Sequence, residues 1–189
     1  TESICDEQEL RFGCCVASSF EITVLDTVES FKGNTMNVSV RLDGALKDYQ
    51  IGKYKVYSDK PTADRRYRQI TAYDALYDIL NAETSKWYNS LAFPMTLRQF
   101  RDSFCAYFGV EQEEITLIND GMNVEKTIDP QELSGKTVIE SICEINGCFG
   151  HIGRNGKLQY VVLEQMIEGL YPADDLYPAD DLYPADPVG

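Results

Sequence analysis

The chain has 189 residues, of which 43% are hydrophobic, so it can bury a core and is not expected to be disordered. Its net charge of −14 argues against specific binding to nucleic acid, because affinity for the phosphate backbone depends on lysine and arginine. The sequence contains no apolar run of membrane-spanning length and no secretory signal pattern, and it therefore predicts a soluble intracellular protein without membrane contact.

The first 70 residues are expected to form antiparallel strands. Apolar and polar residues alternate, as in strands with one buried face, over residues 20–24, 36–42, 49–57 and 67–71. Turn-forming residues separate these stretches at 32–34, 43–44 and 59–61. The pattern predicts a meander or a small barrel. Gly52 lies inside one of the strands and indicates a bulge or a close approach of another group.

Helical spacing replaces this alternation after residue 71. The apolar residues of 72–80 lie on one side of a helix of about three turns. A second helix is expected to begin after Thr96, which forms a capping box with Gln99, and to end at Gly109. A third helix is expected to run from Ser134 or Thr137 to Gly147.

Strands are expected again in the second half. Residues 114–118 read as a short strand. Residues 149–152 and 158–163 read as a hairpin, in which Asn155 and Gly156 predict a type I′ turn.

These elements predict an α+β protein. An antiparallel β-barrel-like domain over residues 1–70 is followed by a small α/β domain over 71–163, with two to three helices and the C-terminal β-hairpin. An extended acidic tail occupies residues 164–189.

The tail repeats the six-residue unit Leu-Tyr-Pro-Ala-Asp-Asp, twice in full and a third time in part. Half of the net charge of the chain lies here, since residues 164–189 contain seven acidic residues and no lysine or arginine. Six is a multiple of two and of three, so each Tyr returns to the same face in a strand or a polyproline helix. The tail is therefore either a flexible linker or a regular interface. The interface residues are Leu170, Tyr171, Leu176, Tyr177, Leu182 and Tyr183.

The candidates for chemistry are Cys143, Cys148 and His151, three metal-ligand residue types within a short stretch. A zinc site would need a fourth ligand, for which Cys14, Cys15 or an aspartate is available. A thiol–imidazole enzyme would have to use His151, since it is the only histidine of the chain. The spacing matches zinc motifs poorly, and a free cysteine commonly packs as a small apolar residue. We therefore expect buried free thiols, no cofactor, no metal and no enzymatic activity, with a metal or enzymatic module as the alternative.

Twelve tyrosines and eight phenylalanines make the chain rich in aromatic residues. Tyrosine is favoured where a surface is buried against a partner, and it is equally common on the half-exposed face of an ordinary sheet. Both interpretations fit, and a module that binds a host receptor or a glycan through exposed tyrosines is a further alternative.

Several short motifs, in the same order, resemble the N-terminal region of tail-tip proteins of siphophages and related prophages. They are Ser-Ile-Cys at 3–5, Leu-Arg-Phe-Gly-Cys at 10–14, Ala-Ser-Ser-Phe-Glu at 17–21, Ile-Gly-Lys-Tyr-Lys-Val at 51–56, Arg-Gln-Ile-Thr-Ala-Tyr-Asp-Ala-Leu at 68–76, Ser-Gly-Lys-Thr-Val-Ile at 134–139, Phe-Gly at 149–150 and Gly-Lys-Leu at 156–158. The repeat of the tail is similar to one found in those proteins.

The resemblance implies a structural protein of the baseplate hub, located in the virion tail and made in the bacterial cytoplasm. It implies a trimeric ring at the end of the tail tube, with the chain itself, the tube or distal tail protein and other tail-tip proteins as partners. Members of this family commonly continue into further domains, and the chain begins with Thr1 rather than methionine. We therefore expect a fragment or a processed chain.

Overall fold

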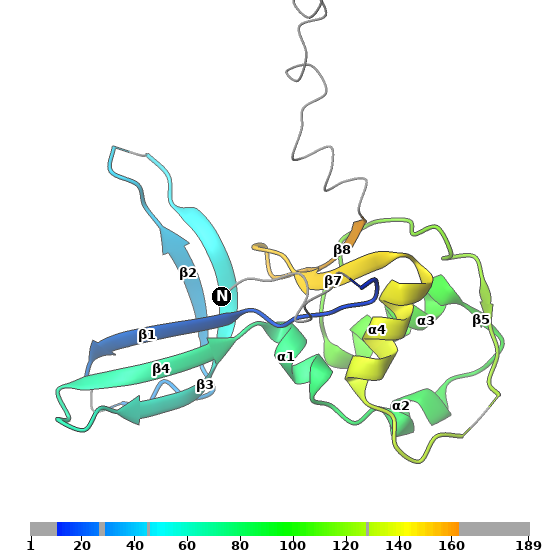
Figure 1. Cartoon of the computed structure of the whole chain (residues 1–189), viewed down its shortest axis with the longest axis horizontal. Helices are drawn as coiled ribbons and strands as arrows, with labels where there is room; N and C mark the ends of the chain where they lie inside the picture. The colour runs from blue at the N-terminus through cyan, green and yellow to red at the C-terminus, as the bar shows by residue number, and fades with distance from the viewer. Residues whose placement is uncertain (1–10, 27–28, 45, 128, 163–189) are drawn as a thin grey trace, which may run out of the picture.

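The computed structural model describes residues 11–26, 29–44, 46–127 and 129–162. A curled antiparallel sheet lies on one side of the molecule, and four helices with a β-hairpin lie on the other (Figure 1). The elements in chain order are β1 (Ser19–Leu25), β2 (Thr35–Val40), β3 (Tyr49–Pro61), β4 (Tyr67–Tyr73), α1 (Ala75–Leu80), α2 (Ser85–Ser90), β5 (Met95–Thr96), α3 (Leu97–Phe108), β6 (Asn123–Val124), α4 (Gly135–Ile145), β7 (Cys148–Ile152) and β8 (Leu158–Val162).

The four predicted N-terminal strands are confirmed, and they form one sheet in the order β1-β4-β3-β2. Every pair is antiparallel. Strands β2, β3 and β4 follow one another as a meander, whereas β1 pairs with β4, placing Ile22 opposite Ile70. Because β1 and β2 remain at the two edges, the predicted barrel-like domain is a curled half-barrel (Figure 1).

Gly52 serves both roles that its position in the strand suggested. The β2–β3 register shifts between Val38, opposite Gly52, and Ser39, opposite Gln50, which leaves Ile51 as the extra residue of a bulge. A Cβ on Gly52 would lie 2.8 Å from the ring of Tyr54. A glycine is therefore needed where the sheet bends.

The predicted turn at residues 59–61 is wrong, because β3 continues to Pro61. The Asp59 carboxylate accepts hydrogen bonds from the Phe31 amide and from Arg68, which holds this end of β3 in the sheet. The chain reverses after Pro61, where the Tyr67 carbonyl accepts from the Thr62 amide at 2.8 Å.

The three predicted helices are confirmed as α1, α3 and α4, with one boundary corrected. Helix α1 begins at Ala75 rather than at residue 72, because Ala72 pairs with β1 and β3 inside the sheet. Asp74 caps α1 by accepting from the Leu76 amide at 2.9 Å, and it also accepts from the Ser18 amide at 2.8 Å. The helix is thus connected to the segment that enters β1.

The ends of α3 and α4 follow the expected capping chemistry. Helix α3 has the complete capping box of Thr96 and Gln99 and ends at Gly109, which has a left-handed φ of 63°. Helix α4 is capped by Ser134, whose hydroxyl accepts from the Thr137 amide at 3.0 Å. The short helix α2 was not expected from the sequence.

The predicted strand at residues 114–118 is wrong, since no strand among the described residues pairs with it. Side chains satisfy its backbone instead: Arg101 donates to the Ile115 carbonyl at 2.8 Å, and the Leu117 amide donates to Asp120 at 2.9 Å. The short strands of this region are β5 and β6, which pair with each other.

The C-terminal hairpin of β7 and β8 is confirmed, but its turn is not type I′. Only Gly156 has a positive φ, of 81°, whereas type I′ requires two such residues. The Gly156 amide donates to the Gly153 carbonyl at 2.8 Å, and the Gly153 amide donates to the Lys157 carbonyl at 2.9 Å. The result is a three-residue loop closed by a glycine.

Two hydrophobic clusters stabilise the molecule. The larger one is built from the helices and the hairpin, and the smaller one covers one face of the half-barrel around Tyr54, Val56, Ile70 and Ala72. Residues 11–18 pack with the helical part rather than with the half-barrel, since the Gly13 amide donates to the Cys148 carbonyl at 3.0 Å. The predicted domain boundaries remain predictions.

Candidate functional site

A large apolar hollow, of about 810 Å³, lies on the half-barrel. Residues of both edge strands, β1 and β2, line it. The two edges of a sheet can border one hollow only on the inner side of a curled sheet. We call it the half-barrel hollow, and its lining residues are Phe20, Ile22, Val24, Leu25, Phe31, Met36, Asn37, Val38, Ser39 and Ile70. Ile22 is 39% exposed and Leu25 is 71% exposed, so large apolar side chains face solvent there.

An ion-pair network lies at the Arg68 end of the same sheet face. Arg68 donates to Asp59 and to Asp26, each at 2.9 Å. Burial opposes ionisation of Asp59, but the hydrogen bonds from Phe31, Arg68 and Ser30 outweigh it and lower the pKa of that carboxyl. This end of the sheet is therefore occupied by polar contacts within the chain, and the free apolar surface is the hollow itself.

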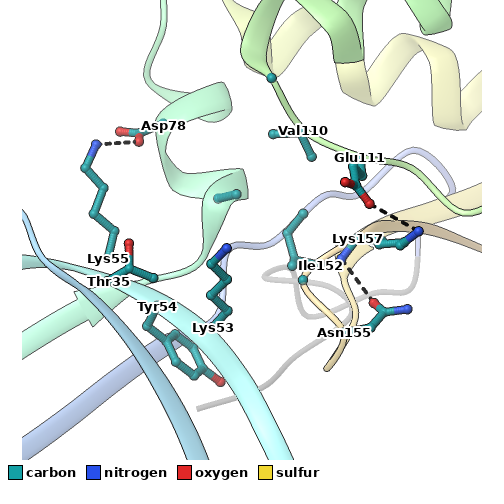
Figure 2. Close-up of a pocket in the computed structure, with 13 residues that line it drawn as sticks. Thr35, Lys53, Tyr54, Lys55, Asp78, Val110, Glu111, Ile152, Asn155 and Lys157 are labelled. Atoms are coloured by element: carbon teal, nitrogen blue, oxygen red, sulfur yellow. Dashed lines mark hydrogen bonds and ion pairs between the residues drawn. The ribbon is translucent and has the colours of Figure 1, made fainter.

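A second opening, of about 350 Å³, lies between β3, α1 and the β7–β8 turn (Figure 2). We call it the lysine cleft, because Lys53, Lys55 and Lys157 line it. Lys55 forms an ion pair with Asp78 at 3.0 Å, and Lys157 forms one with Glu111 at 3.1 Å. Apolar lining comes from Ala75, Val110 and Ile152.

Three half-buried tyrosines pack together beside this cleft, where the sheet meets α1. The rings of Tyr73 and Tyr77 stack with centroids 4.2 Å apart, and Tyr57 meets Tyr77 edge-on at 4.7 Å. The Tyr57 hydroxyl donates to Asp78, and burial, followed by that hydrogen bond, raises the pKa of Tyr57. These tyrosines bury one another, whereas Tyr49 and Tyr67 are exposed. Receptor or glycan binding remains a prediction.

The structure separates the predicted thiol–imidazole pair. Residues three apart on a strand point to opposite faces, so Cys148 faces the core and His151 faces away. In the part of the chain that is described, no group of histidine, cysteine, aspartate or glutamate side chains is arranged to hold a metal ion.

The cysteines instead form a buried cluster. The Sγ atoms of Cys15 and Cys143 are 3.7 Å apart, and the Cys148 thiol donates to the Cys143 carbonyl at 3.5 Å. Hydrogen bonds with Cys148 and Cys15, together with burial, raise the pKa of the Cys143 thiol. Burial also raises the pKa of the Cys105 thiol to about 11. Both thiols are protonated at neutral pH and behave as core side chains.

Sequence reasoning missed a buried arginine. Arg101 on α3 is 2% exposed and donates two hydrogen bonds of 2.8 Å to Asp120, one of 2.7 Å to Gln112 and one to the Ile115 carbonyl. The sequence could have predicted that Arg101 is buried, because it lies midway between Leu97 and Cys105 on the apolar stripe of the helix. The arrangement fixes the loop from α3 to β6.

The predicted interface residues of the repeat, Leu170 to Tyr183, lie outside the described residues. Within the described ranges, none of the helices has the length and apolar character needed to cross a membrane.

Comparison with known proteins gives a likeness among solved structures. No protein-family model and no curated protein sequence matches the chain. Among solved structures, the fold is similar to that of the 43 kDa tail protein of prophage MuSo2 from Shewanella oneidensis, with a TM-score of 0.55 and 14% sequence identity. The match covers 77% of this chain and 46% of that protein, so the chain spans less than half of its length. The likeness supports the α+β fold with its curled half-barrel.

Proposed function

We propose that the chain is a structural subunit of a bacteriophage or prophage tail, located in the tail tip or baseplate hub. Two findings support this role. The chain resembles tail-tip proteins in the order of its motifs, and its fold is similar to that of a protein described as a prophage tail protein. In this role the chain binds other proteins and has no substrate and no cofactor.

The observation that carries the proposal is the open half-barrel hollow. A sheet that curls without closing leaves part of its inner apolar face in water, including Ile22. Burying the exposed part of this side chain against a partner stabilises an assembly, by less than the roughly 1.5–3 kcal/mol of a fully exposed side chain. A second copy that covers the hollow makes a head-to-tail contact, and three such contacts close a ring. We propose this trimeric ring at the end of the tail tube.

The proposed partners follow from this arrangement. The ring would contact the tail tube or distal tail protein above it and other tail-tip proteins below it. The negative charge of the chain suits a channel that DNA passes without being retained, since like charges repel.

Electron microscopy of the purified full chain tests the ring directly. We expect rings with a central opening in negatively stained samples at high protein concentration. Single compact particles at every concentration would contradict the proposal. The metal alternative predicts about one zinc per chain by elemental analysis, and its absence would leave assembly as the better account.

A further inference from the structure

We propose that the lysine cleft is a docking site for the Leu-Tyr-Pro-Ala-Asp-Asp repeat of the same chain. The inference is independent of the phage role. It concerns a cleft and a sequence motif that the proposed assembly through the half-barrel hollow does not use.

The charge in the cleft centres on Lys53. Figure 2 shows its side chain rising from β3 into the space between α1 and the β7–β8 turn. Lys55 and Lys157 already have carboxylate partners, but among the described residues no carboxylate lies within ion-pair distance of Lys53. Arg154, exposed in the adjoining turn, adds positive charge at the rim.

The apolar lining of the cleft suits the Leu-Tyr-Pro part of the repeat. Ala75, Val110 and Ile152 line the cleft together with the three lysines. A ligand that fits must therefore combine carboxylates with apolar or aromatic groups at short spacing. Each of the two full repeats offers this combination, with a Leu-Tyr-Pro stretch followed, after one alanine, by two aspartates.

The distribution of charge favours binding of the acidic tail in the lysine cleft. The tail has seven acidic residues and no lysine or arginine, and the rest of the chain has 24 acidic residues against 17 lysines and arginines, so the net charge of the rest also repels the tail. The cleft is an exception, because its three lysines outnumber the two carboxylates, Asp78 and Glu111, that also line it.

The chain is long enough for docking within one molecule. From Lys157, which lines the cleft, to Val162 at the end of β8 is about 17 Å at the rise of a strand. The seven residues from 163 to 169 span about 23 Å when extended, so the first repeat can return to the cleft.

Zero-length carbodiimide coupling of the full chain, followed by peptide mass spectrometry, tests the proposal. We expect amide links from Lys53 to one or more of the aspartates at 174, 175, 180 and 181. The Lys55–Asp78 and Lys157–Glu111 pairs are internal positive controls for the chemistry. Lys60, exposed near the far end of β3, is the matched control and should give few links to the repeat.

An isotope-labelling experiment shows whether the same chain or a second copy supplies the docked tail. In an equal mixture of chains labelled with nitrogen-14 and nitrogen-15, links within one chain contain a single isotope. Mixed-isotope links would show that a second copy supplies the tail, which would overturn docking within one molecule.

Proteolysis adds a measurement that does not depend on coupling. A protease that cleaves before aspartate should cut the repeat about threefold to fivefold faster in Lys53→Glu, the change expected for loss of one partly exposed ion pair. Lys60→Glu should leave the rate unchanged. Equal rates in all three proteins, or equal linking of Lys53 and Lys60 to the repeat, would overturn the proposal.

Discussion

Arg101 is a buried charge at the centre of a hydrogen-bond network in the helical part. A buried guanidinium must be paired, because an isolated charge inside a protein is strongly unfavourable. Asp120, Gln112 and the Ile115 carbonyl supply its partners, and the ring of Tyr160 lies 5.3 Å from the guanidinium carbon. One side chain thus connects α3, the loop after it and β8.

Replacing Arg101 by methionine should therefore lower the free energy of unfolding by about 3–5 kcal/mol, because Asp120 is left buried without its partner. Urea denaturation followed by circular dichroism measures the change. Arg98→Met is the matched control on the same helix: Arg98 is 48% exposed and lies 3.9 Å from Asp102, so a loss below about 1 kcal/mol is expected. Equal losses in the two variants would contradict this role of Arg101.

Stability should also fall in acid through Asp120. The hydrogen bond from Arg101 lowers the pKa of Asp120 below its usual value. A carboxyl with a lower pKa in the folded state stabilises the fold above its unfolded pKa of about 4, and this contribution is lost as the pH falls through the folded pKa. Asp120→Asn should reduce the dependence of unfolding free energy on pH below 4, as measured by urea denaturation at several pH values.

Some roles of single residues could be predicted from the local sequence, and others could not. The cap residues Thr96, Ser134 and Gly109 act within a few positions of their own place in the chain, and they were predicted correctly. The partners of Cys143 and His151 depend on which face of a strand each side chain occupies and on a cysteine far away in the chain. Local spacing could not supply that information.

Helices α1 and α4 approach each other closely at one glycine. Gly135, at the start of α4, lies so close to α1 that a Cβ would be 2.2 Å from the Ile79 carbonyl oxygen. A side chain at this position forces the two helices apart.

Gly135→Ala should therefore lower the free energy of unfolding by about 1–3 kcal/mol, as other overpacked sites do. The change is measurable as a lower Tm by differential scanning calorimetry. Gly121→Ala is the control, because no atom lies within 4 Å of the place that its new Cβ would take and its φ is not left-handed. If both variants melt at the wild-type temperature, the close contact does not contribute to stability.

Elements were predicted well where the pattern was regular and local. The strands of the half-barrel and helices α3 and α4 have clear periods and caps. Residues 114–118 look like a strand by composition, yet hydrogen bonds from Arg101 and to Asp120 replace the strand pairing. The six-residue helix α2 is too short for its period to be recognised.

At the scale of the whole molecule, the half-barrel hollow is the most consequential feature. Alternation along each strand predicted which residues share a face, but pairing of β1 with β4 joins segments about 50 residues apart and could not be read locally. Whether a sheet closes or stays open depends on that pairing. An open sheet with an apolar inner face is what the assembly account requires.

Introducing a charge into the hollow should weaken assembly. Ile22→Asp places a carboxylate on the inner face, where burial against a second copy would desolvate it, and we expect association to weaken at least tenfold by mass photometry. Ile118→Asp is the control, because Ile118 is 86% exposed and lies outside the half-barrel. A similar response in both variants would place the contact elsewhere.

Sedimentation equilibrium of the unmodified full chain at high concentration tests the central claim most directly. The account predicts a reversible equilibrium that ends in a species of three times the 21.4 kDa chain mass. A single species of 21.4 kDa over the whole concentration range would contradict it.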